Sequence, residues 1–164
     1  MISVLIICVH IIRKVRIMAE QKAWLGVVSR AHVQRGVAEG IAQVCHGRAA
    51  PLRRMKPGDY LVYYSPSVEM HGEPLRAFTA LGRVVDGDVF QFDMGGGFVP
   101  FRRRVVYEKV AREAPLAELK DRLELCATPS WGMALRRGHL PLSEHDFSLI
   151  AAAMGVRLTR RLAA

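Results

Sequence analysis

The chain has 164 residues, of which 51% are hydrophobic and 24% are charged. This length fits one domain with a real buried core, and the hydrophobic content excludes disorder over most of the chain. The formal net charge is +9, but six of the 24 basic residues lie in residues 1–18 and 155–164, which contain no acid. The remainder has 18 basic against 15 acidic residues, so charge alone does not establish nucleic-acid binding.

The three cysteines, Cys8, Cys45 and Cys126, are odd in number and lack a C-x-x-C spacing. This favours free thiols in a reducing, cytoplasmic compartment over a disulfide framework. A zinc site needs about four ligands, usually in paired short spacings. Cys45 and His46 have no such second pair, so we expect buried packing for Cys45, no metal and no cofactor.

Residues 1–12 are almost wholly apolar, but a transmembrane helix needs about 20 apolar residues. Basic residues follow this run, whereas a secretory signal places them before it. Met18 begins a segment typical of a protein start. We therefore expect residues 1–17 to be an extension, consistent with a start-site artefact, residues 18–155 to be the folded domain, and residues 156–164 to be a basic tail. No membrane partner is expected.

Four elements are predicted in the first part of the chain. Residues 24–28 are rich in β-formers and predict a strand. Ser29 is a suitable N-cap for a helix over residues 30–39, which Gly40 would close. Residues 41–46 are either a short strand or irregular, and residues 52–55 predict one turn of helix.

The sequence GDYLVYYSP at 58–66 predicts a central strand that begins at a Pro-Gly turn and stops at Pro66. Tyr63 and Tyr64 must point to opposite faces of this strand. One ring is expected in the core and the other at an opening. The alternative is that both rings are ordinary sheet packing.

The second half of the chain predicts more strands and two helices. Residues 77–85 and 89–94 flank an Asp-Gly turn, which predicts a hairpin. In a strand leading to residue 107, alternation would place Arg102 and Arg104 on one face and Arg103 on the other. Leucine spacing predicts a helix over 115–123, residues 127–142 are expected to be irregular, and Ser143 would cap a helix ending at Gly155.

These elements amount to five or six mostly antiparallel strands with three or four short helices. The fold class is therefore expected to be α+β, with a small closed or partly open barrel.

The chain has no phosphate-binding loop, nucleophile elbow or histidine spacing typical of a metal site, so we expect no enzyme. It does have aromatic rings and arginines near strand ends, which suit unpaired or flipped nucleotides. The alternative is that the rings are core and the arginines form a solvated face.

Six segments together resemble the EVE domain family of the PUA-like superfamily, which is related to YTH and ASCH domains. They are WLGVVS (24–29), GDYLVYYSP (58–66), FTALGRV (78–84), GFVPFRRRV (97–105), WGMALRRG (131–138) and EHDFSLIAAAM (144–154). The resemblance implies a pseudo-barrel surrounded by helices, with an aromatic pocket that takes a modified base of nucleic acid.

Matched position by position, the resemblance implies two sets of site residues. Those expected at the base-binding pocket are Trp24, Ser29, Tyr63, Tyr64, Ser65, Pro66, Trp131 and Gly132. Those expected to contact phosphate are Arg136, Arg103 and Arg102.

The expected function is thus a non-catalytic module that binds a modified base in DNA or RNA. Two alternatives remain open: a protein that binds a small molecule or free nucleobase, and an enzyme that acts on nucleotides.

Overall fold

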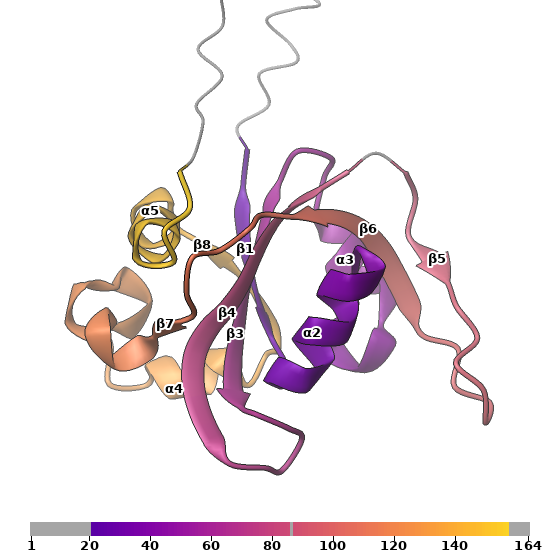
Figure 1. Cartoon of the computed structure of the whole chain (residues 1–164), viewed down its shortest axis with the longest axis horizontal. Coiled ribbons are helices and arrows are strands. Elements are labelled where there is room, and N and C mark those ends of the chain that lie inside the picture. The colour runs from indigo at the N-terminus through magenta and orange to yellow at the C-terminus, as the bar shows by residue number, and fades with distance from the viewer. Residues whose placement is uncertain (1–20, 86, 158–164) are drawn as a thin grey trace, which may run out of the picture.

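The computed structural model describes residues 21–85 and 87–157, whose strands form one mixed sheet (Figure 1). The strands are β1 (Ala23–Val27), β2 (Ile41–Ala42), β3 (Tyr60–Ser67), β4 (Pro74–Val84), β5 (Phe90–Gln91), β6 (Phe101–Tyr107), β7 (Ala114–Pro115) and β8 (His139–Leu142). Their order is β2-β6-β4-β3-β1-β8, while β5 pairs with β6 and β7 with β4. β1 and β3 are parallel, and the other pairs are antiparallel. The sheet bends along β4, which pairs with β7 near its start and β6 near its end.

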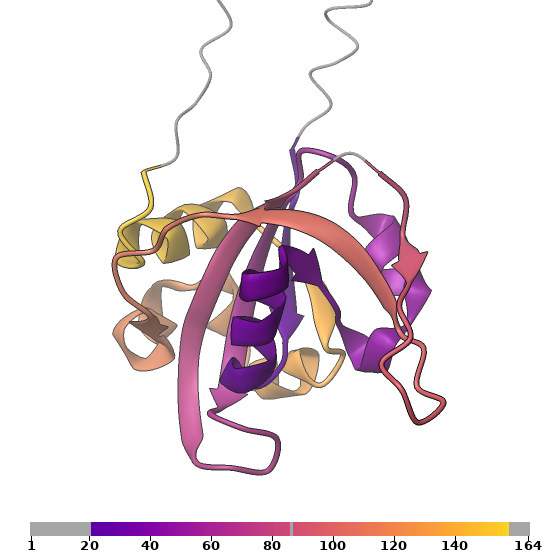
Figure 2. The same ribbon diagram turned by 45° about the vertical axis from the view of Figure 1, so that its right-hand side comes forward.

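The helices are short and cover both faces of the sheet. They are α2 (Arg30–Glu39), α3 (Ala49–Arg54), α4 (Trp131–Leu135), α5 (Glu144–Ala153) and the 3-10 turns η1 (Cys45–Gly47), η2 (Leu116–Glu118), η3 (Lys120–Arg122) and η4 (Glu124–Cys126). α2 and α3 lie on one side of the sheet, and α4, α5 and η2 to η4 lie on the other (Figures 1 and 2). This curled α+β half-barrel is the predicted fold class. Within the described residues, no helix has the length and apolar character needed to cross a bilayer.

The sheet separates two buried clusters. On the side of α2 and α3, which we call the α2 face, Trp24 and Tyr63 pack with Leu52. On the other side, the α5 face, Tyr64 packs with Ile150. The prediction that the two adjacent tyrosines point to opposite faces is confirmed.

Gly26 is the position on β1 where the α2 face has no room for a side chain. A Cβ there would lie 2.7 Å from the Tyr63 ring and 3.1 Å from a Val44 methyl group. Gly26→Ala is therefore expected to lower the free energy of unfolding by about 1–3 kcal/mol, as overpacked cores do. Chemical denaturation would measure this loss.

Gly132 provides the matched control for that substitution. A Cβ at Gly132 would have no neighbour within 4 Å. Because alanine favours helix over glycine, Gly132→Ala is expected to be neutral or to stabilise by up to about 1 kcal/mol. Equal losses in the two variants would contradict the steric explanation.

The two longest helices begin where predicted, and α5 ends at Ala153, two residues before the predicted Gly155. α2 ends at Gly40, whose φ of 64° is left-handed. Ser29 occupies its N-cap position, although its side chain makes no capping hydrogen bond. At α5 the Ser143 hydroxyl accepts a 3.2 Å hydrogen bond from the Asp146 N–H, as expected of a cap.

The hairpin predicted between residues 77–85 and 89–94 is wrong. β5 instead pairs with β6, where Phe90 lies opposite Arg102. The three glycines at 95–97 all have positive φ and reverse the chain locally. The nearest partner for β5 is therefore the strand that follows it, not the strand that precedes it.

The helix predicted over residues 115–123 is also wrong. Pro115 lies in β7, and the chain then forms the separate turns η2 and η3. Leu116, Leu119 and Leu123 are nevertheless all buried on the α5 face. A short segment has little helical stability of its own, so packing of these leucines decides its path.

Two smaller predictions need correction. β3 does not stop at Pro66 but continues to Ser67, with a register shift that accommodates the proline. Residues 127–142 are not irregular, because they form α4 and β8, and β8 pairs with β1.

Candidate functional site

The carboxyl ends of β1 and β3 meet at one edge of the sheet because these strands are parallel neighbours. The Val28 N–H donates to the Tyr64 carbonyl oxygen at 3.2 Å, just where the strands end. Beyond this hydrogen bond lie the half-buried Ser29 and the exposed Pro66. The sheet therefore brings two of the predicted site segments side by side.

The Cys45–Gly47 turn (η1) lies against the loop that enters β8. The Cys45 thiol donates to the Arg137 carbonyl oxygen at 3.5 Å, and a Cβ on Gly138 would lie 3.0 Å from the same sulfur. Gly138 in turn accepts a 2.9 Å hydrogen bond from the Val27 N–H. The turn has φ values of 49°, 56° and 77°, so three successive residues are left-handed. The end of β1, this turn and this loop therefore meet.

Trp24 and His139 stack on the α2 face beside the turn. Their ring centroids are 5.0 Å apart and their planes differ by 12°. The Trp24 Nε1–H donates to Asp59 Oδ2 at 2.8 Å, which holds the indole in place.

His139 is 3% exposed, yet neither ring nitrogen has a hydrogen-bond partner in the part of the chain that the structure describes. Burial, and then the charge of Arg54, lower the pKa of His139 to about 4, so the ring is neutral at pH 7. A neutral imidazole has one donor and one acceptor, and buried polar groups without partners are rare. This orphaned pair makes His139 the strongest single indication of a ligand site.

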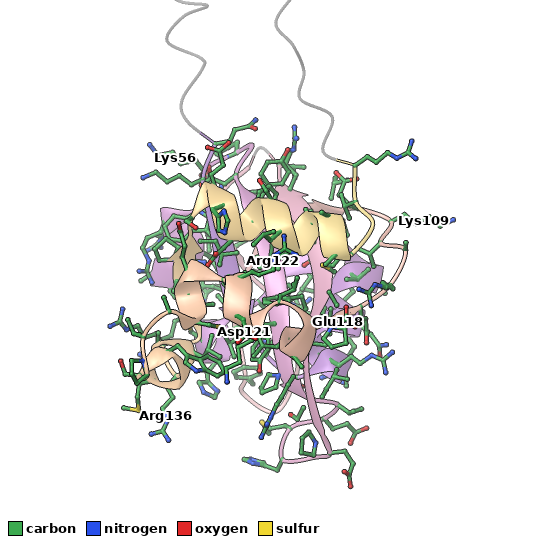
Figure 3. All side chains as sticks on the ribbon, turned by 90° about the vertical axis from the view of Figure 1, so that its left-hand side faces the viewer. Lys56, Lys109, Glu118, Asp121, Arg122 and Arg136 are labelled. Atoms are coloured by element: carbon green, nitrogen blue, oxygen red, sulfur yellow. The ribbon has the colours of Figure 1, made fainter. Side chains whose placement is uncertain are left out.

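Five exposed arginines, which we call the arginine rim, occupy α3 and the segments next to this arrangement: Arg48, Arg53, Arg54, Arg136 and Arg137. None of the five forms an ion pair with a described residue. The charges of Arg54 and Arg48 both act on Cys45. Arg136 extends away from the body of the domain (Figure 3). No acidic side chain among the described residues therefore compensates the positive charge of the rim through an ion pair.

Cys45 is not an activated nucleophile. Burial raises the pKa of its thiol, against the opposite effects of Arg54 and Arg48. The thiol is therefore protonated at neutral pH.

Three of the residues expected at the pocket lie in the core. Tyr63 is 1% exposed on the α2 face, and burial raises the pKa of its hydroxyl. Tyr64 packs against Phe78 on the α5 face. Ser65 is fully buried, and its hydroxyl shares a 2.8 Å hydrogen bond with Thr79. They would contact a ligand only after the sheet edge rearranged, and their role there stays a prediction.

Trp24 and Trp131, both expected at one base-binding pocket, pack in different clusters. Trp131 is half-buried at the start of α4 on the α5 face, with the Lys120 ammonium 5.7 Å from its ring centroid. Gly132 beside it is exposed. The structure places Trp24 against His139 but does not bring the two indoles together.

Of the three arginines expected to contact phosphate, only Arg136 is exposed. Arg102 is 5% exposed and bonds to Glu39 at 2.7 Å and to Gln43 at 3.1 Å, so its charge is already compensated. Arg103 is 6% exposed, and its Nε has no partner among the described residues.

Sequence reasoning missed His139 and the arginines of the α3 region. The sequence did carry a signal for Arg48, Arg53 and Arg54, because three basic residues and no acid lie in the short helical segment around Pro51. No comparable signal existed for His139, because its contact with Trp24 depends on the pairing of β1 with β8.

Two surface depressions lie elsewhere. One is lined by residues 68–69 and 71–74, and the other by residues 120–124 and 126–127. Neither includes Trp24 or His139. Across residues 21–85 and 87–157, no group of three or more His, Cys, Asp or Glu side chains is arranged to hold a metal ion.

Comparison with known proteins identifies the family. The EVE domain model matches residues 22–153. A UPF0310 protein of Renibacterium salmoninarum is 50% identical over 132 residues, which cover 80% of this chain and 94% of that protein. The UPF0310 protein YdcG of Bacillus subtilis is 43% identical over 138 residues, which cover 83% of this chain and 94% of YdcG.

Solved structures of lower identity share the fold. The N-terminal domain of Staphylothermus marinus McrB is 10% identical with a TM-score of 0.54, covering 79% of this chain and 93% of that one. Human THYN1, in complex with DNA containing 5-methylcytosine, is 14% identical with a TM-score of 0.51. The match covers 84% of this chain and 99% of the THYN1 chain. These likenesses confirm the half-barrel fold. The EVE domain model matches most of this chain, and the chain therefore belongs to the EVE domain family.

Proposed function

We propose that this chain is a non-catalytic nucleic-acid-binding module that takes a modified base between the Trp24–His139 stack and the Cys45–Gly47 turn. The observation that carries the proposal is the orphaned pair of buried His139 nitrogens, next to a rim of unpaired arginines.

The arginine rim suits a phosphate backbone. Guanidinium groups donate bidentate hydrogen bonds to phosphate, and binding releases the counterions of the nucleic acid. An arginine that already has an acidic partner, such as Arg102, contributes less. The proposal therefore assigns phosphate contacts to the rim, including the predicted Arg136, and not to Arg102.

The base site has the donors and acceptors that recognition needs. Neutral His139 can donate from one nitrogen and accept at the other, which matches the edge of a base. Trp24 holds the imidazole ring by stacking. Entry of a base requires the Cys45–Gly47 turn to move. Cys45 and His46 there are non-glycine residues with positive φ, a backbone conformation typical of functional sites.

Two further observations support the proposal. The fold is shared with human THYN1, whose structure contains DNA with 5-methylcytosine. The raised pKa of Cys45 also favours binding over nucleophilic catalysis, because a protonated thiol is a weak nucleophile.

Fluorescence anisotropy of the full chain with labelled 12-nucleotide DNA and RNA tests the proposal. The set would contain plain, 5-methylated and 5-hydroxymethylated cytosine and N6-methylated adenine, at two salt concentrations. We expect salt-sensitive binding with a preference for one modified base of about ten- to a hundredfold, the usual effect of a methyl-sized contact. Salt-insensitive binding of a free nucleobase would instead establish the small-molecule alternative.

A paired charge variant tests the arginine rim. Arg54→Gln with Arg136→Gln is expected to weaken binding roughly tenfold and to reduce the slope of log K against log salt by about 1.5. The control is Lys109→Gln with Arg122→Gln, whose side chains lie at other places on the surface (Figure 3) and should not matter. Equal effects of the two pairs would contradict a localised phosphate site.

A further inference from the structure

A hairpin-like arm, residues 90–100, begins with β5 and projects from the body of the domain ahead of β6 (Figures 1 and 2). Its two sides are joined by hydrogen bonds from the Phe92 N–H to the Pro100 carbonyl at 3.1 Å and from the Met94 N–H to the Phe98 carbonyl at 3.0 Å. The tip is the three glycines at 95–97, where an added Cβ would have no neighbour within 4 Å. The tip therefore stands clear of the rest of the described chain.

The arm exposes large apolar side chains that lie outside the buried core. Phe92, Met94, Phe98 and Val99 are 48%, 49%, 47% and 41% exposed. None of them belongs to either buried cluster. Apolar side chains gathered on one protruding ribbon are typical of a surface that is covered by a partner.

The base of the arm adjoins the proposed nucleic-acid site. A Cβ on Gly47 would lie only 2.3 Å from Pro100, so the Cys45–Gly47 turn packs tightly against the arm. The Arg53 guanidinium lies over the Phe101 ring at 5.8 Å. A single ligand can thus contact the arginine rim and the arm together.

Positive charge on β6, directly after the arm, indicates the kind of partner. The Arg102 and Arg104 guanidinium groups stack on the rings of Phe92 and Phe90, 4.0 and 4.9 Å from their centroids. The one acidic residue in 90–104 is Asp93, whose carboxylate accepts a hydrogen bond from the Gly95 N–H at 2.8 Å. Arg104 is exposed and forms no ion pair with a described residue, whereas the charge of Arg102 is compensated by Glu39. Aromatic rings beside an uncompensated cation suit a partner that has both bases and phosphates.

We propose that the arm inserts an apolar side chain of Phe92, Met94 or Phe98 between neighbouring bases of the nucleic acid held by the arginine rim. This inference rests on the proposed function and deepens it. Gly96, at the centre of the tip, lies four residue steps from both Phe92 and Pro100, a reach of at most about 13 Å in extended chain. That length is enough to enter a groove of a duplex from its backbone.

Insertion would also explain how a base reaches the site. A flipped base leaves a gap in the stack and loses its stacking energy. Apolar wedges such as Phe and Met fill gaps of this kind and partly unstack the neighbouring step. The arm and the base site would therefore act on adjacent positions of one strand.

The test uses the full chain and a 12-base-pair duplex with 2-aminopurine next to a central cytosine, plain or 5-methylated. Binding of the unaltered protein is expected to raise 2-aminopurine fluorescence, because this base brightens when unstacked. The arm variant combines three substitutions, Phe92→Ala, Met94→Ala and Phe98→Ala. It should abolish the rise in 2-aminopurine fluorescence and weaken binding by about ten- to a hundredfold, as loss of stacking contacts does. The salt slope should stay unchanged, because no phosphate contact is removed.

The control removes three exposed apolar side chains elsewhere: Val37→Ala, Met70→Ala and Val106→Ala. It should keep both the affinity and the fluorescence rise. If the arm variant also keeps both, the inference fails while the proposed function stands. If the unaltered protein binds no duplex or single strand even at low salt, the proposed function itself fails. A protein dimer that the arm variant converts to monomer would overturn the inference in favour of a second copy of the chain.

Discussion

Replacing Asp59 with alanine is expected to lower the free energy of unfolding by about 4 kcal/mol. The buried carboxylate accepts three hydrogen bonds, from the Trp24 indole at 2.8 Å and from the backbone N–H groups of Lys22 and Lys56 at 3.1 and 2.9 Å. Each buried donor that loses its partner costs roughly 1–3 kcal/mol. Urea denaturation followed by circular dichroism would measure the loss.

Two further variants make the Asp59 result specific. Asp59→Asn keeps one carbonyl oxygen, which can still accept from two of the three donors, so the loss should fall to about half. Asp121→Ala removes an exposed carboxylate and should change stability by less than about 0.5 kcal/mol. A small loss in Asp59→Ala would mean that water replaces the carboxylate and that the Trp24 indole is not held as the hydrogen bonds indicate.

Acidification from pH 7 to pH 4 is expected to remove about 3 kcal/mol of stability through His139 alone. Its pKa is about 4 in the folded chain against 6.5 ordinarily, and each unit corresponds to about 1.4 kcal/mol. Above pH 6.5 neither state holds the proton, so His139 has no effect. Between pH 6.5 and 4 the unfolded chain takes up the proton and the folded chain does not, so stability falls.

His139→Phe isolates this effect, because phenylalanine keeps a ring against Trp24 but does not titrate. Denaturation midpoints of both proteins between pH 7 and pH 4 should show a loss about 3 kcal/mol smaller in the variant. His32, whose pKa burial also lowers, is present in both proteins and cancels in the comparison. Parallel profiles would show that His139 titrates at its ordinary pKa and is therefore not a buried neutral group.

Much of the local structure could be predicted from the sequence. The boundaries of α2, the cap at Ser143 and the opposite orientations of Tyr63 and Tyr64 follow from rules that act over a few residues. The family resemblance likewise rests on short segments in a fixed order. The wrong hairpin and the wrong helix at 115–123 were also local inferences. The glycine turn at 95–97 outweighed the Asp-Gly signal in the first, and packing of the leucines against the α5 face outweighed helical spacing in the second.

The candidate site was predicted less well. Ser29, Pro66 and Arg136 were named from sequence and lie at exposed or half-buried positions next to the sheet edge. Arg102 was named as a phosphate contact, yet it pairs with Glu39, which is distant in sequence. His139 was not selected at all.

By itself the sequence determined α2, α5 and the central strand β3, the α+β class and the family, because periodicity, caps and turn residues are encoded locally. Only the tertiary structure decided which charges are compensated and which polar atoms are left without partners. Those properties depend on distances between residues far apart in the chain, such as Trp24 and His139. Strand pairing sets these distances, and burial then sets the strength of each interaction by removing water.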